Sequence, residues 1–171
     1  RAAQMSNQLQ KQHDLILALG GRLSQKGLIM ATAESCTGGG IGAEITAVAG
    51  SSGWFSGGII SYSNSAKINL LKVSSGLLEA HGAVSEAVVE AMALGGCRAL
   101  NADVCVAVSG VAGPGGGTTE KPVGSVWVAW AQSNGAVASE LFQFVGNRQS
   151  VRQQTIAAAL EGMNRAHLPC L

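Results

Sequence analysis

The chain of 171 residues is long enough for one domain that buries roughly two-thirds of its unfolded surface. Its residues are 47% hydrophobic and 12% charged, and its formal net charge is +1. This composition excludes intrinsic disorder and provides no field that would attract a polyanion, so we expect no nucleic-acid partner. The low fraction of charge also favours a homo-oligomer, with a dimer as the simplest case, because another copy would then cover part of the surface.

The cysteines and the hydropathy pattern predict where the protein works. Cys36, Cys97, Cys105 and Cys170 do not follow C-x-x-C spacing, and a reduced cysteine is an ordinary core residue. No signal peptide or apolar run of about eighteen residues is recognised. We therefore expect a cytoplasmic protein with no membrane partner. Residues 1–8 are expected to be a flexible N-terminal segment or a cloning remnant, and residues 9–168 to form the domain.

Apolar spacing predicts the elements in chain order. Helical periodicity predicts helices at 6–26, 41–48, 65–71, 85–100 and 150–165. Short apolar runs predict strands at 28–33, 58–62, 104–109, 126–131 and 141–145, the last two joined by a hairpin at 133–135. Strands that alternate with helices are typical of a single-domain three-layer α/β/α sandwich with a mixed, mostly parallel sheet.

Three polar loops each follow a predicted strand, at 34–40, 61–67 and 109–117. In open α/β sheets, ligands bind in the crevice at the carboxyl ends of the strands. We therefore expect the three loops to form one site. Arg148 begins the last predicted helix at the same edge, and a guanidinium there is suited to hold a phosphate or a carboxylate.

The first of these loops, A-E-S-C-T-G-G-G at 33–40, is compatible with several interpretations. Gly38, Gly40 and Ala43 match a dinucleotide-binding fingerprint, but the acidic residue that should follow about twenty positions later is missing. The glycines also fit a helix N-terminus that cradles a phosphate. The simpler interpretation is a capping turn in which Thr37 or Ser35 caps the helix. Local sequence leaves the last two interpretations open.

Nucleophilic catalysis by a serine requires a base, and the sequence offers one candidate. His13, His81 and His167 fall in a helix, a polar turn and the C-terminal end, whereas Lys67 follows a predicted strand. Serine-lysine pairs are an established alternative to serine-histidine pairs. The pKa of Lys67 must then fall by about three units, or about 4 kcal/mol, which burial can supply. The alternative is an ordinary surface lysine, and Cys36 is a rival nucleophile without a nearby activator.

Six motifs occur here in the order and spacing of the CinA C-terminal domain family, which the chain resembles from about residue 15 to 160. The motifs are A-E-S-C-T-G-G, G-S-S-G-W-F, Y-S-N-S-A-K, G-A-V-S, S-G-V-A-G-P-G-G-G with K-P-V-G, and F-V-G-N-R-x-x-V-R. Members are nicotinamide-nucleotide amidohydrolases, which convert nicotinamide mononucleotide to nicotinate mononucleotide and ammonia. The resemblance implies the same reaction, a small nucleotide substrate, and no metal or other cofactor.

The family also carries an older label, competence- and damage-inducible protein. That label implies an alternative, a DNA-linked regulatory protein or a nucleotide-binding protein without turnover. Binding to a phosphate backbone requires several clustered lysines or arginines. The eleven basic residues are instead spread along the chain, which argues against DNA.

The resemblance also implies roles for individual residues. Ser35 would be the nucleophile and Lys67 the general base, with Tyr62 and Ser52 as supporting polar groups and Ser52 as the alternative nucleophile. Backbone N–H groups around Thr37 and Gly38 would stabilise the oxyanion. The residues expected to bind the substrate are Thr37, Gly38, Gly39, Ser109, Gly110, Gly113 and Arg148.

Overall fold

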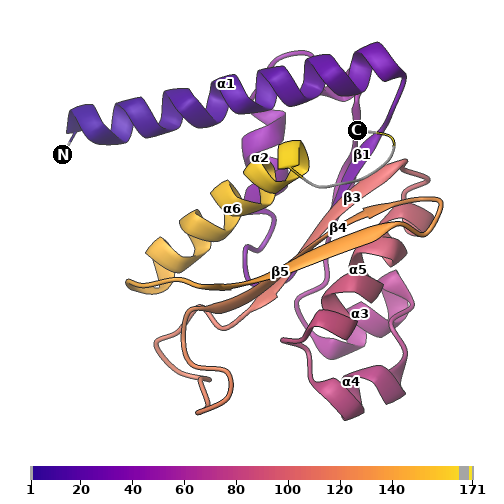
Figure 1. Ribbon diagram of the computed structural model, residues 1–171, viewed down its shortest axis with the longest axis vertical. Coiled ribbons are helices and arrows are strands. Elements are labelled where there is room, and N and C mark those ends of the chain that lie inside the picture. The colour runs from indigo at the N-terminus through magenta and orange to yellow at the C-terminus, as the bar shows by residue number, and fades with distance from the viewer. Residues whose placement is uncertain (1, 166–169, 171) are drawn as a thin grey trace.

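The computed structural model describes residues 2–165 and 170 and contains a five-stranded sheet with the order β2-β1-β3-β4-β5 (Figure 1). Strands β1, β2 and β3 run parallel to one another, and β4 is antiparallel to both β3 and β5. The sheet is therefore mixed, with β4 opposed to the other four strands. The strands are β1 (Met30–Glu34), β2 (Phe55–Ile60), β3 (Val104–Gly110), β4 (Ser125–Gln132) and β5 (Val137–Gln143).

Helices cover both faces of this sheet, which confirms the three-layer α/β/α sandwich (Figure 1). One face carries α1 (Ala2–Lys26), α2 (Gly40–Thr46) and α6 (Arg148–Arg165). The other face carries α3 (Asn64–Leu71), α4 (Ser75–His81) and α5 (Glu86–Ala99). Each helical layer closes a separate hydrophobic cluster against the sheet.

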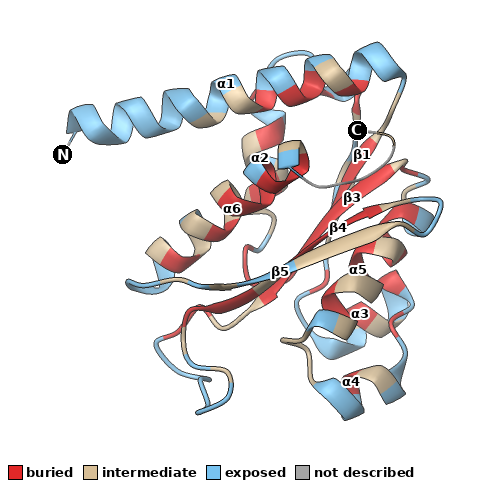
Figure 2. Cartoon of the chain, viewed as in Figure 1, coloured by how far each residue is buried: buried red, intermediate tan, exposed pale blue. Residues whose placement is uncertain are grey.

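The central strand β3 is buried on both faces, as its unbroken apolar run predicts. Because side chains alternate along a strand, Val104, Val106 and Val108 join one cluster while Cys105 and Ala107 join the other. The second face is made of small side chains, and α5 packs close to it, since a Cβ on Gly96 would meet the Cys105 sulfur. Figure 2 shows the buried centre of the sheet between the two layers.

Two elements differ from the sequence prediction. The last strand spans Val137–Gln143 rather than 141–145, because the hairpin turn ends early and the strand contains the polar residues Ser139 and Glu140. A strand at the edge of a sheet tolerates polar residues. A prediction based on apolar runs therefore places such a strand at the wrong residues. The segment around His81, expected as a polar turn, belongs to α4, which Ser74 caps by accepting a hydrogen bond from the N–H of Leu77.

The first helix begins at Ala2, so residues 2–8 are helical in the structure and exposed. Its buried residues all fall in the second half, and the first half extends past the body of the domain (Figures 1 and 2). Within residues 2–165 and 170, no helix is long and apolar enough to cross a bilayer. His167 and the expected domain boundary at residue 168 lie outside the described residues.

Candidate active site

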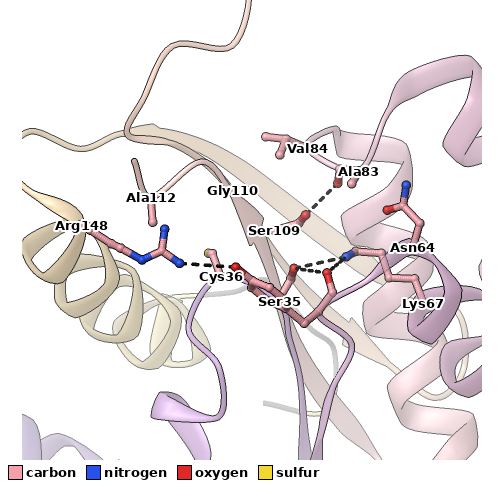
Figure 3. Close-up of a pocket in the computed structure, with 11 residues that line it drawn as sticks. Ser35, Cys36, Asn64, Lys67, Ala83, Val84, Ser109, Gly110, Ala112 and Arg148 are labelled. Atoms are coloured by element: carbon pink, nitrogen blue, oxygen red, sulfur yellow. Dashed lines mark hydrogen bonds between the residues drawn. The ribbon is translucent and has the colours of Figure 1, made fainter. Parts of the chain in front are cut away.

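The three polar loops meet in one cavity of about 230 Å³ at the carboxyl ends of β1, β2 and β3 (Figure 3). Ser35 contributes from the loop after β1, Tyr62 and Lys67 from the segment after β2, and Ser109 from the end of β3. The parallel pairing of these strands brings the three loops to the same edge. Arg148 at the start of α6 also lines the cavity.

Lys67 is 1% exposed and its amine contacts the hydroxyl of Ser35. The Nζ atom donates to Ser35 Oγ at 3.2 Å, to the carbonyl oxygen of Ser61 at 2.9 Å and to that of Tyr62 at 3.2 Å. Burial lowers the pKa of Lys67 below its ordinary value. Once neutral, the amine keeps two hydrogens for the two carbonyls and turns its lone pair to Ser35. This is the arrangement that a general base requires.

Cys36 also lines the cavity, but its thiol is not activated. Burial raises the pKa of Cys36 to about 11, and the nearby Arg152 guanidinium offsets only part of that effect. The thiol is therefore protonated near neutral pH, and a thiol is a poor nucleophile. Between Ser35 and Cys36, the geometry favours Ser35 as the nucleophile.

The junction between β1 and α2 is capped by Glu34, which is 1% exposed. Its carboxylate accepts hydrogen bonds from the hydroxyl of Thr37 at 2.6 Å and from the N–H groups of Ile41 at 2.9 Å and Gly42 at 3.0 Å. The N–H groups proposed as a phosphate cradle are thus occupied by the protein's own carboxylate. The capping-turn interpretation holds, with Glu34 as the capping residue in place of Thr37 or Ser35.

Several residues expected to bind substrate do not line the cavity. Thr37 is fully buried, and its hydroxyl donates to Glu34. The N–H of Gly38 donates to the carbonyl of Ser35 within the turn, so it is not available to an oxyanion. Gly39 adopts a left-handed conformation, with φ 94°, before α2. These three residues shape the turn that carries Ser35.

Ser52 lies away from the cavity. It belongs to the short 3-10 helix η1 (Ser51–Gly53), which precedes β2 and is therefore at the opposite end of that strand from Tyr62. Its side chain is exposed. Within this chain, Ser52 is too far along the sheet to assist Ser35 or to replace it.

Arg148 and Tyr62 contact each other across the cavity from the lysine. Figure 3 shows Ser35 between Arg148 on one side and Lys67 on the other. Arg148 Nη1 donates to the carbonyl of Gly113 at 2.8 Å, and its Nη2 donates to the Tyr62 hydroxyl at 3.4 Å. The contact of Tyr62 with Lys67 is through its backbone carbonyl. The phenol therefore belongs to the arginine side of the site.

The remaining lining comes from residues that the sequence prediction partly missed. Ser109 and Gly110 line the cavity as expected, and the Ser109 hydroxyl donates to the carbonyl of Ala83 at 2.8 Å. Asn64, Ala83, Val84 and Ala112 also line it and were not predicted. The motifs G-A-V-S and Y-S-N-S-A-K contain three of these four residues, so the signal was present in the sequence.

Comparisons with known proteins show related chains of similar length. A sequence model of the CinA C-terminal domain matches residues 12–167. A protein of Enterobacter agglomerans named nicotinamide-nucleotide amidohydrolase PncC is 51% identical over 149 residues, which cover 87% of this chain and 91% of that protein. The protein of the same name from Escherichia coli K12 is 48% identical over 143 residues, which cover 84% of this chain and 87% of that protein.

Solved structures of related proteins have the same fold. The competence/damage inducible protein CihA from Agrobacterium tumefaciens superposes with a TM-score of 0.87 at 38% identity, covering 90% of this chain and 94% of that chain. By its fold, the chain is a three-layer α/β protein, and its cavity holds a buried lysine beside a serine. The chain belongs to the CinA C-terminal domain family.

Proposed function

We propose that this protein is a nicotinamide-nucleotide amidohydrolase, which hydrolyses the carboxamide of nicotinamide mononucleotide to nicotinate mononucleotide and ammonia. Two proteins of that name share about half of their aligned residues with this chain, and each alignment covers most of this chain and of the relative. The observation that carries the proposal is the buried Lys67 amine 3.2 Å from Ser35 Oγ at the wall of the cavity. No cofactor is needed for this reaction.

Ser35 and Lys67 supply the groups for a two-step hydrolysis. Neutral Lys67 takes the proton of Ser35 while Ser35 Oγ attacks the carboxamide carbon. The Lys67 ammonium then gives this proton to the leaving nitrogen, and ammonia departs from an acyl-serine ester. Water attacks the ester with Lys67 again as base, which releases the carboxylic acid and restores Ser35.

The turn after Ser35 offers an oxyanion donor. Because the carbonyl of Ser35 accepts from the N–H of Gly38, the plane of the Ser35–Cys36 peptide is fixed. The N–H of Cys36 points opposite to that carbonyl in a trans peptide. We assign this N–H to the oxyanion, since the residue after the nucleophile commonly has this role. Removing one such donor typically costs about 3 to 4 kcal/mol.

The size of the cavity suggests how the nucleotide is held. A volume of about 230 Å³ is below the roughly 300 to 1,000 Å³ of sites that enclose a whole ligand of drug size. We infer that the pyridine ring enters first and that the phosphate stays at the mouth. Arg148 is exposed there, and its planar guanidinium suits a phosphate group.

Compartment and assembly are also proposals. All four cysteines are free thiols in the structure, which fits a reducing, cytoplasmic compartment. Exposed apolar side chains lie along α1 at Met5, Leu9 and Leu17. Such a surface supports a homo-oligomer, and a dimer is its simplest form.

The test is release of ammonia and nicotinate mononucleotide from nicotinamide mononucleotide without added metal. We expect turnover by the wild type and a loss of at least about a hundredfold in Ser35→Ala and in Lys67→Met, the scale of a positioned base. Matched controls are the exposed neighbours Ser65→Ala and Lys72→Met, which should keep wild-type rates. A wild type that binds the nucleotide without releasing ammonia would refute the proposed activity.

A further inference from the structure

We propose that Arg152 is a positioning residue that holds the turn carrying Ser35 in its reactive conformation. Its Nε atom donates to the carbonyl of Cys36 and its Nη2 atom to the carbonyl of Thr37, both at 3.1 Å. Arg152 lies on α6, 116 and 115 positions from these residues. The role deepens the proposed function, because it acts through the nucleophile of that reaction.

The contacts of the turn explain why an external clamp is needed. Within the turn, the carbonyl of Ser35 accepts from the N–H of Gly38, and the carbonyl of Thr37 accepts from the N–H of Gly40. The carbonyl of Cys36 is bound by Arg152 from another element. Since each peptide unit is planar, holding this carbonyl fixes the Cys36–Thr37 peptide, which adjoins the Ser35–Cys36 peptide that directly follows the nucleophile.

The backbone next to Arg152 contains two consecutive glycines in the left-handed region. Gly38 has φ 59° and Gly39 has φ 94°, and glycine loses more conformational freedom on ordering than other residues do. A Cβ added to Gly38 would lie 3.3 Å from Arg152 Nη2. The guanidinium therefore lies beside the glycine segment of the turn, whose ordering has a high entropic cost that a hydrogen-bonding clamp offsets.

Arg152 and Arg148 are separated by one turn of α6 but have different surroundings. Arg148 lines the cavity and contacts Gly113 and Tyr62, whereas Arg152 is half-buried and contacts the backbone of the Ser35 turn. The guanidinium of Arg152 also counteracts the rise in the pKa of the Cys36 thiol. Its positive charge thus reaches the turn where the oxyanion would form.

The experiment measures Arg152→Ala in two independent ways, by steady-state kinetics on nicotinamide mononucleotide and by the rate at which a fluorophosphonate labels Ser35. We expect kcat and the labelling rate both to fall about tenfold to a hundredfold, the cost of misplacing a reacting group, with KM nearly unchanged. Added guanidinium ion should restore part of both rates, and Arg152→Lys should be intermediate. Arg165→Ala, an exposed arginine at the end of the same helix, is the matched control.

Arg148→Ala separates the two roles, since it should raise the KM for the nucleotide by a larger factor than it lowers the labelling rate of Ser35, the opposite of the pattern expected for Arg152→Ala. The positioning role is overturned if Ser35 is labelled in Arg152→Ala at the wild-type rate. It is also overturned if the rates lost in Arg152→Ala are restored neither by added guanidinium ion nor in Arg152→Lys. Absence of labelling in the wild type overturns it as well, because no activated serine would then be present. If the wild type is labelled but does not hydrolyse the nucleotide, the proposed function fails while the labelling rates of the variants still decide the role of Arg152.

Discussion

The amine of Lys67 lies 3.2 Å from the hydroxyl oxygen of Ser35, although 32 positions separate the two residues. The parallel pairing of β1 with β2 brings them together, since the last residues of these strands, Glu34 and Ile60, are register partners. Lys67 is also 1% exposed, and this burial lowers its pKa below the ordinary range. Contact with Ser35 and a lowered pKa therefore occur together at this lysine.

The lowered pKa of Lys67 predicts how activity and stability depend on pH. Activity should rise with pH as Lys67 becomes neutral, with a midpoint below the ordinary lysine pKa of about 10.4. Between the folded and the unfolded pKa the unfolded chain binds more protons, so the free energy of unfolding should also rise with pH there. Lys67→Met should remove this dependence, measured by urea unfolding across the pH range.

Lys72→Met serves as the control for this experiment, because Lys72 is exposed at the C-terminal end of α3, the helix that carries Lys67. Its unfolding curve should change with pH as the wild-type curve does. A Lys67→Met protein with the wild-type pH dependence would show that Lys67 is not the group responsible.

Cys36 gives a second prediction, which separates the two adjacent nucleophile candidates. Burial holds its pKa at about 11, so alkylation by iodoacetamide should be slow at neutral pH and accelerate only in strongly alkaline solution. Cys36→Ala should retain most of the activity, because the backbone N–H and the carbonyl held by Arg152 are unchanged. Loss of activity on the scale of Ser35→Ala would instead make the thiol the nucleophile.

A third prediction concerns Glu34, whose carboxylate fastens α2 to the end of β1. Each carboxylate oxygen accepts from two donors, so Glu34→Gln places an amide NH₂ against N–H or O–H groups. We expect a loss of about 1 to 3 kcal/mol of unfolding free energy, the cost of an unsatisfied buried donor. Glu44→Gln on the same helix, a half-buried carboxylate bound by the Gln12 side chain, should cost less. Equal effects of the two substitutions would contradict the capping role.

The sequence predicted the layers and the edge of the sheet that carries the site. Those predictions succeeded because alternating apolar patterns and polar loops after strands are local signals, as in the buried run of β3. The pairing of Ser35 with Lys67 came from the family resemblance and from the chemistry of an activated serine. The structure adds the contacts of the lysine with two backbone carbonyls.

What the sequence did not predict depends on contacts between distant segments. Glu34 caps α2 from the end of a strand, so no local capping rule assigns it. Arg152 reaches the Ser35 turn from 116 positions away. Ser52 is part of a family motif, but η1 places it at the other end of β2. In each case the deciding information is the packing of elements, which spacing along one chain does not contain.

Two adjacent glycines on α1, Gly20 and Gly21, give the last prediction, because one is buried and the other is exposed. Gly20 is buried, and a Cβ there would overlap the indole ring of Trp54, which is 5% exposed. Gly20→Ala should therefore destabilise the domain by about 1 to 3 kcal/mol through overpacking. Gly21 is exposed with nothing within 4 Å of its added Cβ, so Gly21→Ala should stabilise it by up to about 1 kcal/mol through helix propensity. Urea unfolding midpoints that move in opposite directions support this packing of α1 on Trp54, whereas shifts of the same sign would show that α1 sits differently on the sheet.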